Sequence, residues 1–344
     1  AAGVILLSHI WYERLCGRYP VAMENLFRRT RVFLTQGPVY APYLTGKSVY
    51  ADSIELPNDD MARRIAADIG TGTKTVFAQV VAEELGVPVG RVRIEYADTA
   101  TTQYAPGSGG SQTVLVNTPA VRAAAAAVKT ELLALAAEEL KQDVTRLSVR
   151  DGSIEIAGDG RKVPFSSLRS LAQRQQLVGI GRRAPHPAGK VALPFAAHFA
   201  EVEVNTRTGE VRVIRYVAAQ DSGRVMNALT FENQVLGGVT MGIGFALTEQ
   251  RILDRQTGKL ASGSWHDYKI PTAMDFPVDF QCVPVDPHDR ECNSVGAKGL
   301  GEPATIPAAA AIANAVCNAI GARIHDAPIT PASIVNALAS KGGR

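Results

Sequence analysis

Gly296-Ala297-Lys298-Gly299-Leu300-Gly301-Glu302-Pro303 is a loop in which three of the first six residues are glycine. Glycine has no Cβ and adopts positive φ readily, so this backbone can approach a ligand closely. The loop presents one carboxylate, that of Glu302, ahead of an apolar helix predicted from about Pro307 to Ile320 and ended by Gly321. Two interpretations of Glu302 are open: a catalytic general base, or a residue of the first helical turn that the helix dipole stabilises.

Two further loops of small residues precede predicted helices. Asp68-Ile69-Gly70-Thr71-Gly72-Thr73 leads into a helix predicted to reach Gly86. The loop Ala105–Ser111 precedes an alanine-rich helix predicted from about Pro119 to Lys141. Such loops present backbone N–H groups and hydroxyls that suit phosphate or other anions. The two loops are centred on Gly72 and Gly109.

Hairpins and further helices are predicted elsewhere in the chain. Asp151-Gly152 indicates a tight turn between two short strands, and Ala200–Asn205 with Glu210–Ala218 forms the strongest hairpin pattern. Asn233–Gly244 predicts an apolar helix with four glycines, which close approach by another backbone or a ligand would explain. A last helix is predicted from about Pro331 to Ser340.

Two helix starts are predicted from side chains that can accept hydrogen bonds from free backbone N–H groups. Asn117 or Thr118 is expected to cap the alanine-rich helix, and Pro119 near its first turn supports that start. Ser166 or Ser167 is expected to cap a short helix after the Asp151-Gly152 hairpin.

The composition indicates a folded chain and excludes several classes of protein. With 344 residues, 46% of them hydrophobic, the chain has enough apolar material for one large domain or two. Lys and Arg number 36 against 33 for Asp and Glu, and no long run of like charges occurs, so no nucleic-acid partner is expected. The longest apolar stretch near the start, Val4–Leu7, is too short to span a membrane and lacks the basic flank of a signal peptide.

The spacing of cysteine and histidine predicts no metal site built from side chains. Cys16, Cys282, Cys292 and Cys317 include no C-x-x-C pair, which argues against zinc ribbons and iron–sulfur ligation. The 6 histidines show no H-x-x-x-H or H-E-x-x-H spacing. The low cysteine density favours a reducing compartment, so a cytoplasmic location is expected, with a periplasmic location through a partner's signal left open.

Residues 1–66 differ in composition from the rest of the chain. They hold many of the tyrosines, Trp11, and a basic cluster formed by Arg28, Arg29 and Arg31. The cluster is interpreted either as a solvated face or as an interface for another subunit. The expected organisation is therefore an N-terminal segment, 1–66, of undefined role and one domain spanning 67–344.

One interpretation takes Asp68–Thr73 as the phosphate loop of a sugar kinase or actin-like ATPase, whose Asp-x-Gly-Thr pattern is similar. In that family the motif follows the first buried strand, whereas Met61–Ala67 makes a poor buried strand. A second phosphate loop of that type is not apparent in the sequence, so this interpretation is the weaker one.

From about Asp68 to the C-terminus, the sequence resembles the molybdenum-binding large subunit of the xanthine dehydrogenase and aldehyde oxidase family. Four blocks carry the resemblance, in matching order. They are DIGTGTKT at 68–75, PGSGGSQT at 106–113, ENQVLGGVTMGIG at 232–244 and GAKGLGEPATIP at 296–307. Four ordered blocks are far more specific than any single glycine-rich loop.

The resemblance implies an α+β fold around a molybdenum–molybdopterin cofactor, whose metal is held by the dithiolene of the pterin and not by side chains. The pyrophosphate, or the cytosine dinucleotide extension common in bacterial members, is expected against two groups of residues. They are Gly70, Thr71, Gly72 and Thr73 in the first loop and Ser108, Gly109, Gly110 and Ser111 in the second. Gln234 is similar to the family's pterin-contacting glutamine, and Lys298, Gly299 and Gly301 join the expected cofactor-binding set. Glu302 matches the family's catalytic base.

The resemblance also implies partners and a reaction. An aldehyde or N-heteroaromatic substrate would be oxidised with oxygen derived from water, and electrons would leave through [2Fe-2S] clusters and FAD on partner subunits. Phe195, Trp265 and Tyr268 are candidates for a substrate funnel, or else core residues. The family's large subunit is much longer than this chain, and residues 1–66 do not resemble its upstream part. We therefore expect either a companion chain that supplies the N-terminal half of the molybdenum site or a non-catalytic half-subunit with a structural role.

Overall fold

The computed structural model describes residues 53–56, 60–64, 68–96, 108–173, 176–186, 188–189 and 191–342. Most of the predicted segment 1–66, with its arginine cluster, lies outside these residues, as do Pro106 and Gly107. The chain forms two compact units. The first contains residues up to Ser108, Gln112–Val191 and Glu291–Val295, and the second contains Gly109–Ser111, Ala192–Arg290 and Gly296–Arg344. The predicted domain 67–344 thus takes in parts of both units.

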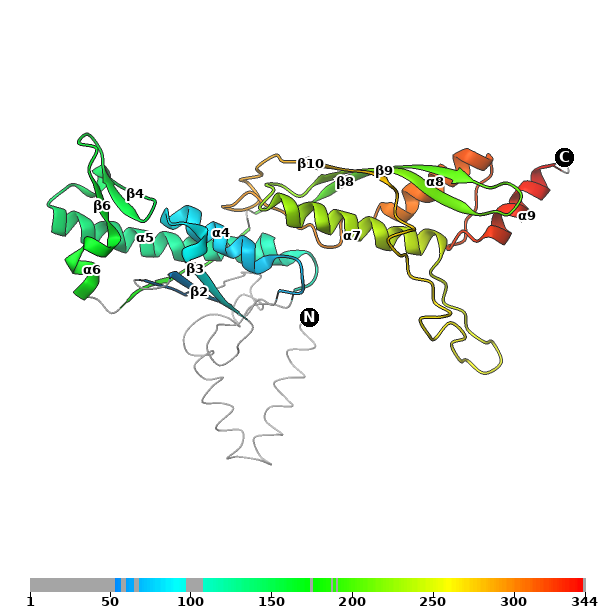
Figure 1. Ribbon diagram of the computed structural model, residues 1–344, viewed down its shortest axis with the longest axis horizontal. Coiled ribbons are helices and arrows are strands. Elements are labelled where there is room, and N and C mark those ends of the chain that lie inside the picture. Colours follow the sequence, from blue (N-terminus) through cyan, green and yellow to red (C-terminus); the bar gives the residue numbers. More distant parts are fainter. Residues whose placement is uncertain are drawn as a thin grey trace, which may run out of the picture. The chain divides into compact units, whose positions relative to one another are not determined.

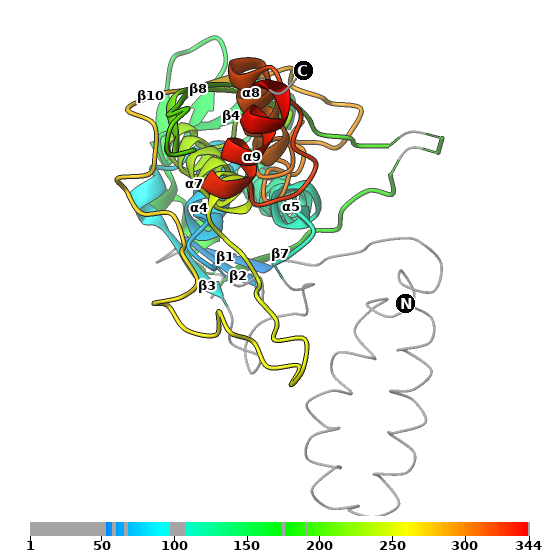
Figure 2. The same ribbon diagram turned by 90° about the vertical axis from the view of Figure 1, so that its right-hand side faces the viewer.

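The first unit is built on a four-stranded sheet with two long helices on one side. In the order of the sheet, the strands are β3 (Val92–Tyr96), β2 (Asp60–Arg64), β1 (Ser53–Leu56) and β7 (Leu177–Ile180). β2 pairs in parallel with β3, and the other pairs are antiparallel. The predicted helices that follow the two small-residue loops are confirmed as α4 (Thr73–Leu85) and α5 (Thr118–Leu140), which lie on the same side of this sheet (Figure 1, Figure 2).

Small residues allow α5 to lie close to the sheet. A Cβ added at Gly179 would stand 2.3 Å from the carbonyl oxygen of Ala124, and one at Gly181 would stand 2.0 Å from that of Ala120. Both alanines are completely buried. The alanine-rich composition of this helix therefore reflects a close helix–sheet contact, since larger side chains at these positions would hold the two elements apart.

The two predicted caps are wrong. A π-helical turn, Thr113–Asn117, runs directly into α5, and the N–H of Thr118 donates to the carbonyl of Val114 in that turn, so no side-chain cap is needed. The short helix α6 (Arg169–Gln173) is capped from a distance. The carboxylate of Glu139 on α5 accepts from the backbone N–H groups of Arg169 and Ser170, both at 2.9 Å. A carboxylate at a helix start also meets the positive end of the helix dipole.

A small antiparallel sheet completes the first unit. It contains β4 (Leu147–Arg150), β5 (Ser153–Ile156) and β6 (Lys162–Pro164). Asp151 and Gly152 join β4 to β5 with positive φ angles of 50° and 71°, so the predicted hairpin is confirmed. The 3-10 turns of this unit are Val89–Arg91, Val144–Arg146 and Phe165–Ser167.

The second unit packs helices on one face of a three-stranded sheet. The predicted long hairpin is confirmed as β8 (Phe195–Val204) and β9 (Val211–Asp221), and β10 (Asp279–Val285) pairs with β9 in parallel. The predicted helices are confirmed as α7 (Ala228–Leu247), α8 (Ala308–Ile320) and α9 (Pro331–Gly342). Across the described ranges of both units, none of the helices is long and apolar enough to cross a membrane.

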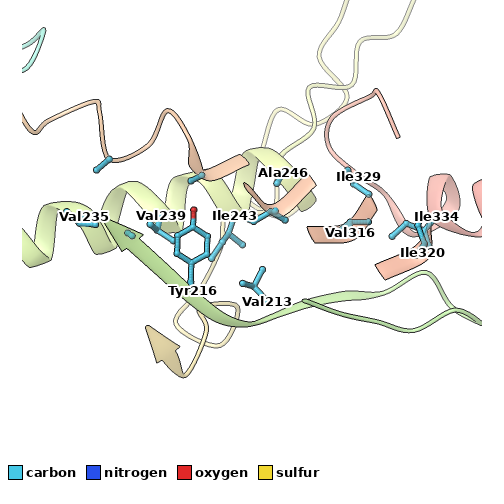
Figure 3. Close-up of a cluster of buried hydrophobic side chains, with 14 of the residues drawn as sticks. Val213, Tyr216, Val235, Val239, Ile243, Ala246, Val316, Ile320, Ile329 and Ile334 are labelled. Atoms are coloured by element: carbon cyan, nitrogen blue, oxygen red, sulfur yellow. The ribbon is translucent and has the colours of Figure 1, made fainter. Parts of the chain in front are cut away.

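The core of the second unit lies between β9, α7 and α8. Tyr216 and Val213 of β9 point toward the α7 residues Val239 and Ile243, and Val316 of α8 joins the same cluster (Figure 3). The Tyr216 side chain is completely buried, and its hydroxyl lies 3.0 Å from Nδ1 of His198 on β8. This pairing satisfies a phenol that burial would otherwise leave without a partner.

Two of the four α7 glycines mark the contact with the segment that enters α8. A Cβ added at Gly238 would stand 2.7 Å from the Cβ of Ala304, and one at Gly242 would stand 2.2 Å from the Cβ of Ala308. At Gly237, by contrast, an added Cβ would meet no atom within 4 Å. The expectation that another backbone approaches this helix closely is therefore correct at Gly238 and Gly242.

Acidification is expected to destabilise the second unit through His198. Burial lowers the pKa of this histidine to about 4, while a hydrogen bond with Gln220 opposes the shift only in part. Because the folded-state pKa lies below the unfolded value of about 6.5, the unfolded chain binds more protons between these two values. Stability is therefore full above about pH 6.5 and falls as the pH drops toward 4.

The expected loss is about 2 kcal/mol between pH 7 and pH 4, after allowance for the partial exposure of the ring. Urea unfolding followed by circular dichroism at a series of pH values measures it. The variant His198→Gln should remove this component of the pH dependence. An unchanged slope in that variant would assign the acid sensitivity to other groups.

Candidate functional site

The predicted Gly296–Pro303 loop is bound to the end of β9. The N–H of Lys298 donates to the carbonyl of Ser222 at 2.7 Å, and Gly223 forms a β-bridge with Ala297. Gly223 has a φ of 63°, and a Cβ at this position would stand 2.3 Å from the carbonyl oxygen of Gly296. Backbone contacts alone therefore hold the first half of the loop against the end of β9.

Lys298 fixes this half of the loop through a buried ion pair. Its Nζ lies 3.0 Å from Oδ2 of Asp221 and 3.4 Å from Oδ2 of Asp289, and its side chain is 8% exposed. Burial alone would lower the pKa of Lys298, but the hydrogen bonds and charges of Asp221 and Asp289 outweigh it and raise the pKa. The ammonium is thus charged and directed at two carboxylates. Its expected contact with the cofactor stays a prediction.

Glu302 lies against the second small-residue loop. The N–H of Gly110 donates to Oε1 of Glu302 at 2.9 Å, and the hydroxyl of Ser111 donates to Oε2. The backbone N–H of Glu302 in turn donates to the Ser111 hydroxyl oxygen at 2.8 Å. Ser111 therefore binds both the carboxylate and the backbone of the same residue, which orients the side chain.

The glycines of the loop allow this close contact. A Cβ at Gly299 would stand 2.6 Å from the Cβ of Ser111, and one at Gly301 would stand 3.0 Å from the Ser111 hydroxyl oxygen. On the helix side, Nε2 of Gln234 on α7 donates to the carbonyl of Gly301 at 2.9 Å. The structure thus brings five of the predicted residues together around Glu302: Gly110, Ser111, Gln234, Gly299 and Gly301.

The helix-turn interpretation of Glu302 is wrong. α8 begins at Ala308 and has no acidic residue in its first turn. The residues between Glu302 and the helix form turns, in which the N–H of Thr305 donates to the Glu302 carbonyl at 2.9 Å. The side chain of Glu302 is exposed, and its polar contacts are with Gly110 and Ser111.

The loop Asp68–Thr73 belongs to the first unit and already binds a carboxylate of its own. Oδ1 of Asp68 accepts from the backbone N–H groups of Gly70 and Gly72 at 3.0 and 3.2 Å, and Oδ2 accepts from the backbone N–H of Lys74 at 3.1 Å. The backbone of this loop is therefore shaped for an anion. The hydroxyls of Thr71 and Thr73 lie 3.3 Å apart. Sequence reasoning missed Asp68, although an aspartate that bonds backbone N–H groups two residues ahead is a known local signal.

The other predicted residues are Ser108 and three aromatic residues, Phe195, Trp265 and Tyr268. Ser108 belongs to the first unit, whereas its neighbours Gly109–Ser111 belong to the second. Phe195 and Trp265 are exposed, at 72% and 83%, so the alternative of core residues is wrong for both. The hydroxyl of Tyr268 donates to Glu249 at 2.8 Å. A substrate funnel formed by these three residues stays a prediction.

The family model of the molybdopterin cofactor-binding domain matches residues 63–277 of the chain. Among curated proteins, the putative xanthine dehydrogenase molybdenum-binding subunit XdhA of Escherichia coli is 37% identical over 278 residues, which cover 77% of this chain and 36% of that protein. The aldehyde oxidoreductase molybdenum-binding subunit PaoC of Escherichia coli is 34% identical over 271 residues, covering 79% of this chain and 36% of that protein. The chain thus spans about a third of the length of these relatives.

Solved structures agree with this assignment of the fold. Quinoline 2-oxidoreductase from Pseudomonas putida 86 superposes with a TM-score of 0.76 at 26% identity, covering 89% of this chain and 40% of that one. The Cu,Mo-CO dehydrogenase superposes with a TM-score of 0.75 at 21% identity, covering 94% of this chain and 46% of that one. The expected mixed α and β architecture is confirmed. The ATPase interpretation of the loop Asp68–Thr73 has no support in these matches.

Proposed function

Because this chain belongs to the molybdopterin cofactor-binding domain family, among the molybdenum-binding subunits of the xanthine dehydrogenase and aldehyde oxidoreductase type, we propose that it forms part of a molybdenum hydroxylase. The proposed reaction is the oxidation of an aldehyde or an N-heteroaromatic compound with oxygen derived from water. The observation that carries the proposal is the position of Glu302. Its carboxylate is exposed and is oriented by donors from a second glycine-rich loop.

The residues around Glu302 fit a cofactor that brings its own metal ligands. A Cβ added at Gly109 or Gly110 would meet no atom within 4 Å, so there is room beside the carboxylate. The loops offer backbone N–H groups and hydroxyls, which suit the polar and anionic parts of a pterin pyrophosphate. In the described part of the chain, His, Cys, Asp and Glu form no group of three or more that could bind a metal. The molybdopterin, when bound, supplies a metal held by its own sulfur atoms and the redox chemistry.

The proposed role of Glu302 is that of a general base. An oxygen of its carboxylate removes a proton from the oxygen nucleophile derived from water, which makes that oxygen more reactive toward the substrate carbon. Gly110 and Ser111 hold the carboxylate in one orientation through its two oxygens. Gln234 fixes the carbonyl of Gly301 directly before Glu302, and Lys298 anchors the loop to β9. These residues therefore position the carboxylate of Glu302, and the proton transfer itself is assigned to Glu302 alone.

The proposal extends to the cofactor contacts, the form of the cofactor, the partner subunits and the compartment. The proposed cofactor contacts of Gly70, Thr71, Gly72 and Thr73 would use the backbone N–H groups of their loop. Some of these N–H groups donate to the carboxylate of Asp68, so Asp68 must share them with the cofactor or move. A cytosine dinucleotide extension of the pterin suits such a loop. [2Fe-2S] and FAD subunits would receive the electrons, and the proposed compartment is the cytoplasm. The relatives are themselves named as subunits, which supports a multi-subunit assembly.

The alternative is a non-catalytic half-subunit with a structural role. It is favoured by one observation, that backbone N–H groups of the loop Asp68–Thr73 already donate to the carboxylate of Asp68 in the same chain. A bound cofactor separates the two proposals, because a half-subunit whose loops only pack against a partner needs none.

Molybdenum content is the direct test. The protein purified natively, with any chains that copurify, is expected to contain close to one molybdenum per chain, with phosphorus from the pterin in proportion. Inductively coupled plasma mass spectrometry measures both elements. Iron is expected only with copurifying subunits. A well-folded assembly free of molybdenum and pterin would contradict the hydroxylase and support the structural alternative.

A further inference from the structure

The outer face of the β10-β9-β8 sheet, opposite α7 and α8, is divided into an apolar half and a charged half. The strand register places residues of the three strands in rows across this face. Three rows are largely apolar: Phe195, Asp221 and Val285; Ala197, Ala219 and Val283; Phe199, Val217 and Gln281. We call the apolar members of these rows the apolar sheet patch, namely Phe195, Ala197, Phe199, Val217, Ala219, Val283 and Val285.

The patch is exposed to a degree that is unusual for large apolar side chains. Phe195 and Phe199 are 72% and 65% exposed, and Val283 and Val285 are 42% and 46% exposed. These side chains stand side by side on neighbouring strands, so they form one surface and not scattered residues. Contiguous exposed apolar surface on a sheet marks an interaction site or an aggregation hazard.

The charged half of the same face has the composition of a solvated surface. The next row contains Glu201, Arg215 and Asp279. Arg215 and Asp279 form an ion pair, in which Nε lies 3.0 Å from Oδ2. Beyond this row, Nη1 of Arg212 lies 3.8 Å from Oε2 of Glu203. The change from charged to apolar residues occurs within two adjacent rows of one sheet. The apolar half is therefore a local feature of the sequence and not a general property of these strands.

The apolar half lies at the end of the sheet that holds the Glu302 loop. Asp221 stands in the same row as Phe195 and Val285, and its carboxylate binds Lys298. From Lys298 the loop continues over four residues to Glu302. A protein surface that covered the patch would therefore lie next to the loop that carries the proposed base.

We propose that the apolar sheet patch is the docking surface for the portion of a molybdenum-binding large subunit that the relatives carry beyond their match to this chain. This inference rests on the proposed function and names one partner of that site. The match covers 36% of the two Escherichia coli subunits, so most of their length lies outside it. The occupant has an apolar surface without charges opposite Phe195 and Phe199, because burying an unpaired charge against them would be costly.

Co-expression tests the proposal with the full-length chain. The probe is the part of Escherichia coli XdhA outside its match to this chain, produced as a separate polypeptide in the same cells as the tagged chain. A complex with one copy of each is expected. The variants Phe195→Asp and Phe199→Asp should each reduce the recovered probe by roughly tenfold, as for residues at the centre of an interface. Both side chains are exposed, so neither variant should alter the circular dichroism melting curve.

The matched control is Leu229→Asp on α7, which is 78% exposed and lies outside the patch. It should leave the recovery of the probe unchanged. The proposal is overturned if no complex forms, or if recovery does not depend on Phe195 and Phe199. It is also overturned if the patch variants instead dissociate a dimer of this chain, or raise hydrogen exchange within residues 1–191 of the same chain. A complex that depends on the patch but contains no molybdenum would retain the docking surface and reject the proposed function.

Discussion

Replacing Glu302 by glutamine is expected to lower kcat of the assembled, molybdenum-containing enzyme by roughly 10²- to 10⁴-fold, the usual contribution of a general base. Glutamine keeps the shape of the side chain and an oxygen that can accept from Gly110, but it cannot take up a proton. Because Glu302 is exposed, the substitution leaves no charge buried and the fold should not change. Steady-state rates with an aldehyde and with an N-heteroaromatic compound measure the effect.

The control for this prediction is Glu201→Gln, the same chemical change at an exposed glutamate of β8. It should leave the rate unchanged, and both variants should contain as much molybdenum as the unaltered protein. A Glu302→Gln enzyme with a near-normal rate and full molybdenum would show that the base is another group. A loss of molybdenum in this variant would instead assign Glu302 to cofactor retention.

Replacing Gly242 by valine is expected to lower the free energy of unfolding by about 3 kcal/mol, the upper part of the range for overpacked cores. The added Cβ would stand 2.2 Å from the Cβ of Ala308 and 3.3 Å from its Cα. Both atoms are attached to the rigid backbone of α8, so the helices must separate. Urea or thermal unfolding followed by circular dichroism measures the loss.

Gly237 provides the matched control in the same helix. A Cβ there would meet no atom within 4 Å, so Gly237→Val should change stability by no more than about 0.5 kcal/mol, because valine is a somewhat better helix former than glycine. An equal loss in both variants would show that the contact with Ala308 does not determine the result.

Local sequence patterns were sufficient to predict most helices and strands. The ends of α4 and α8 follow from apolar periodicity and from the glycines after the last turn, Gly86 and Gly321, which have φ angles of 61° and 62°. Asp151-Gly152 predicted its hairpin for a similar reason. In each case the interacting groups are only a few residues apart, so the chain carries the information locally. The predicted helix Asn233–Gly244 was too short, because α7 begins at Ala228 and ends at Leu247.

Helix caps were predicted less well, because their partners are not always local. Asn117 and Ser167 have suitable side chains, yet a preceding π-helical turn and the distant Glu139 take their places. The role of Asp68 is local but does not follow from the loop alone, because its backbone N–H groups suit an external anion as well as this carboxylate. Backbone N–H groups accept whichever suitable acceptor the fold brings nearest.

For this protein, the sequence alone determined the family, the small-residue loops and the choice of Glu302, since each depends on residue types in a short ordered motif. Only the tertiary structure decided what surrounds Glu302. Ser111 and Glu302 are separated by 191 positions, and Lys298 and Asp221 by 77. The apolar sheet patch likewise exists only because three strands align in register. Such contacts depend on which surfaces the core brings together and removes from water, and a short stretch of sequence does not specify that.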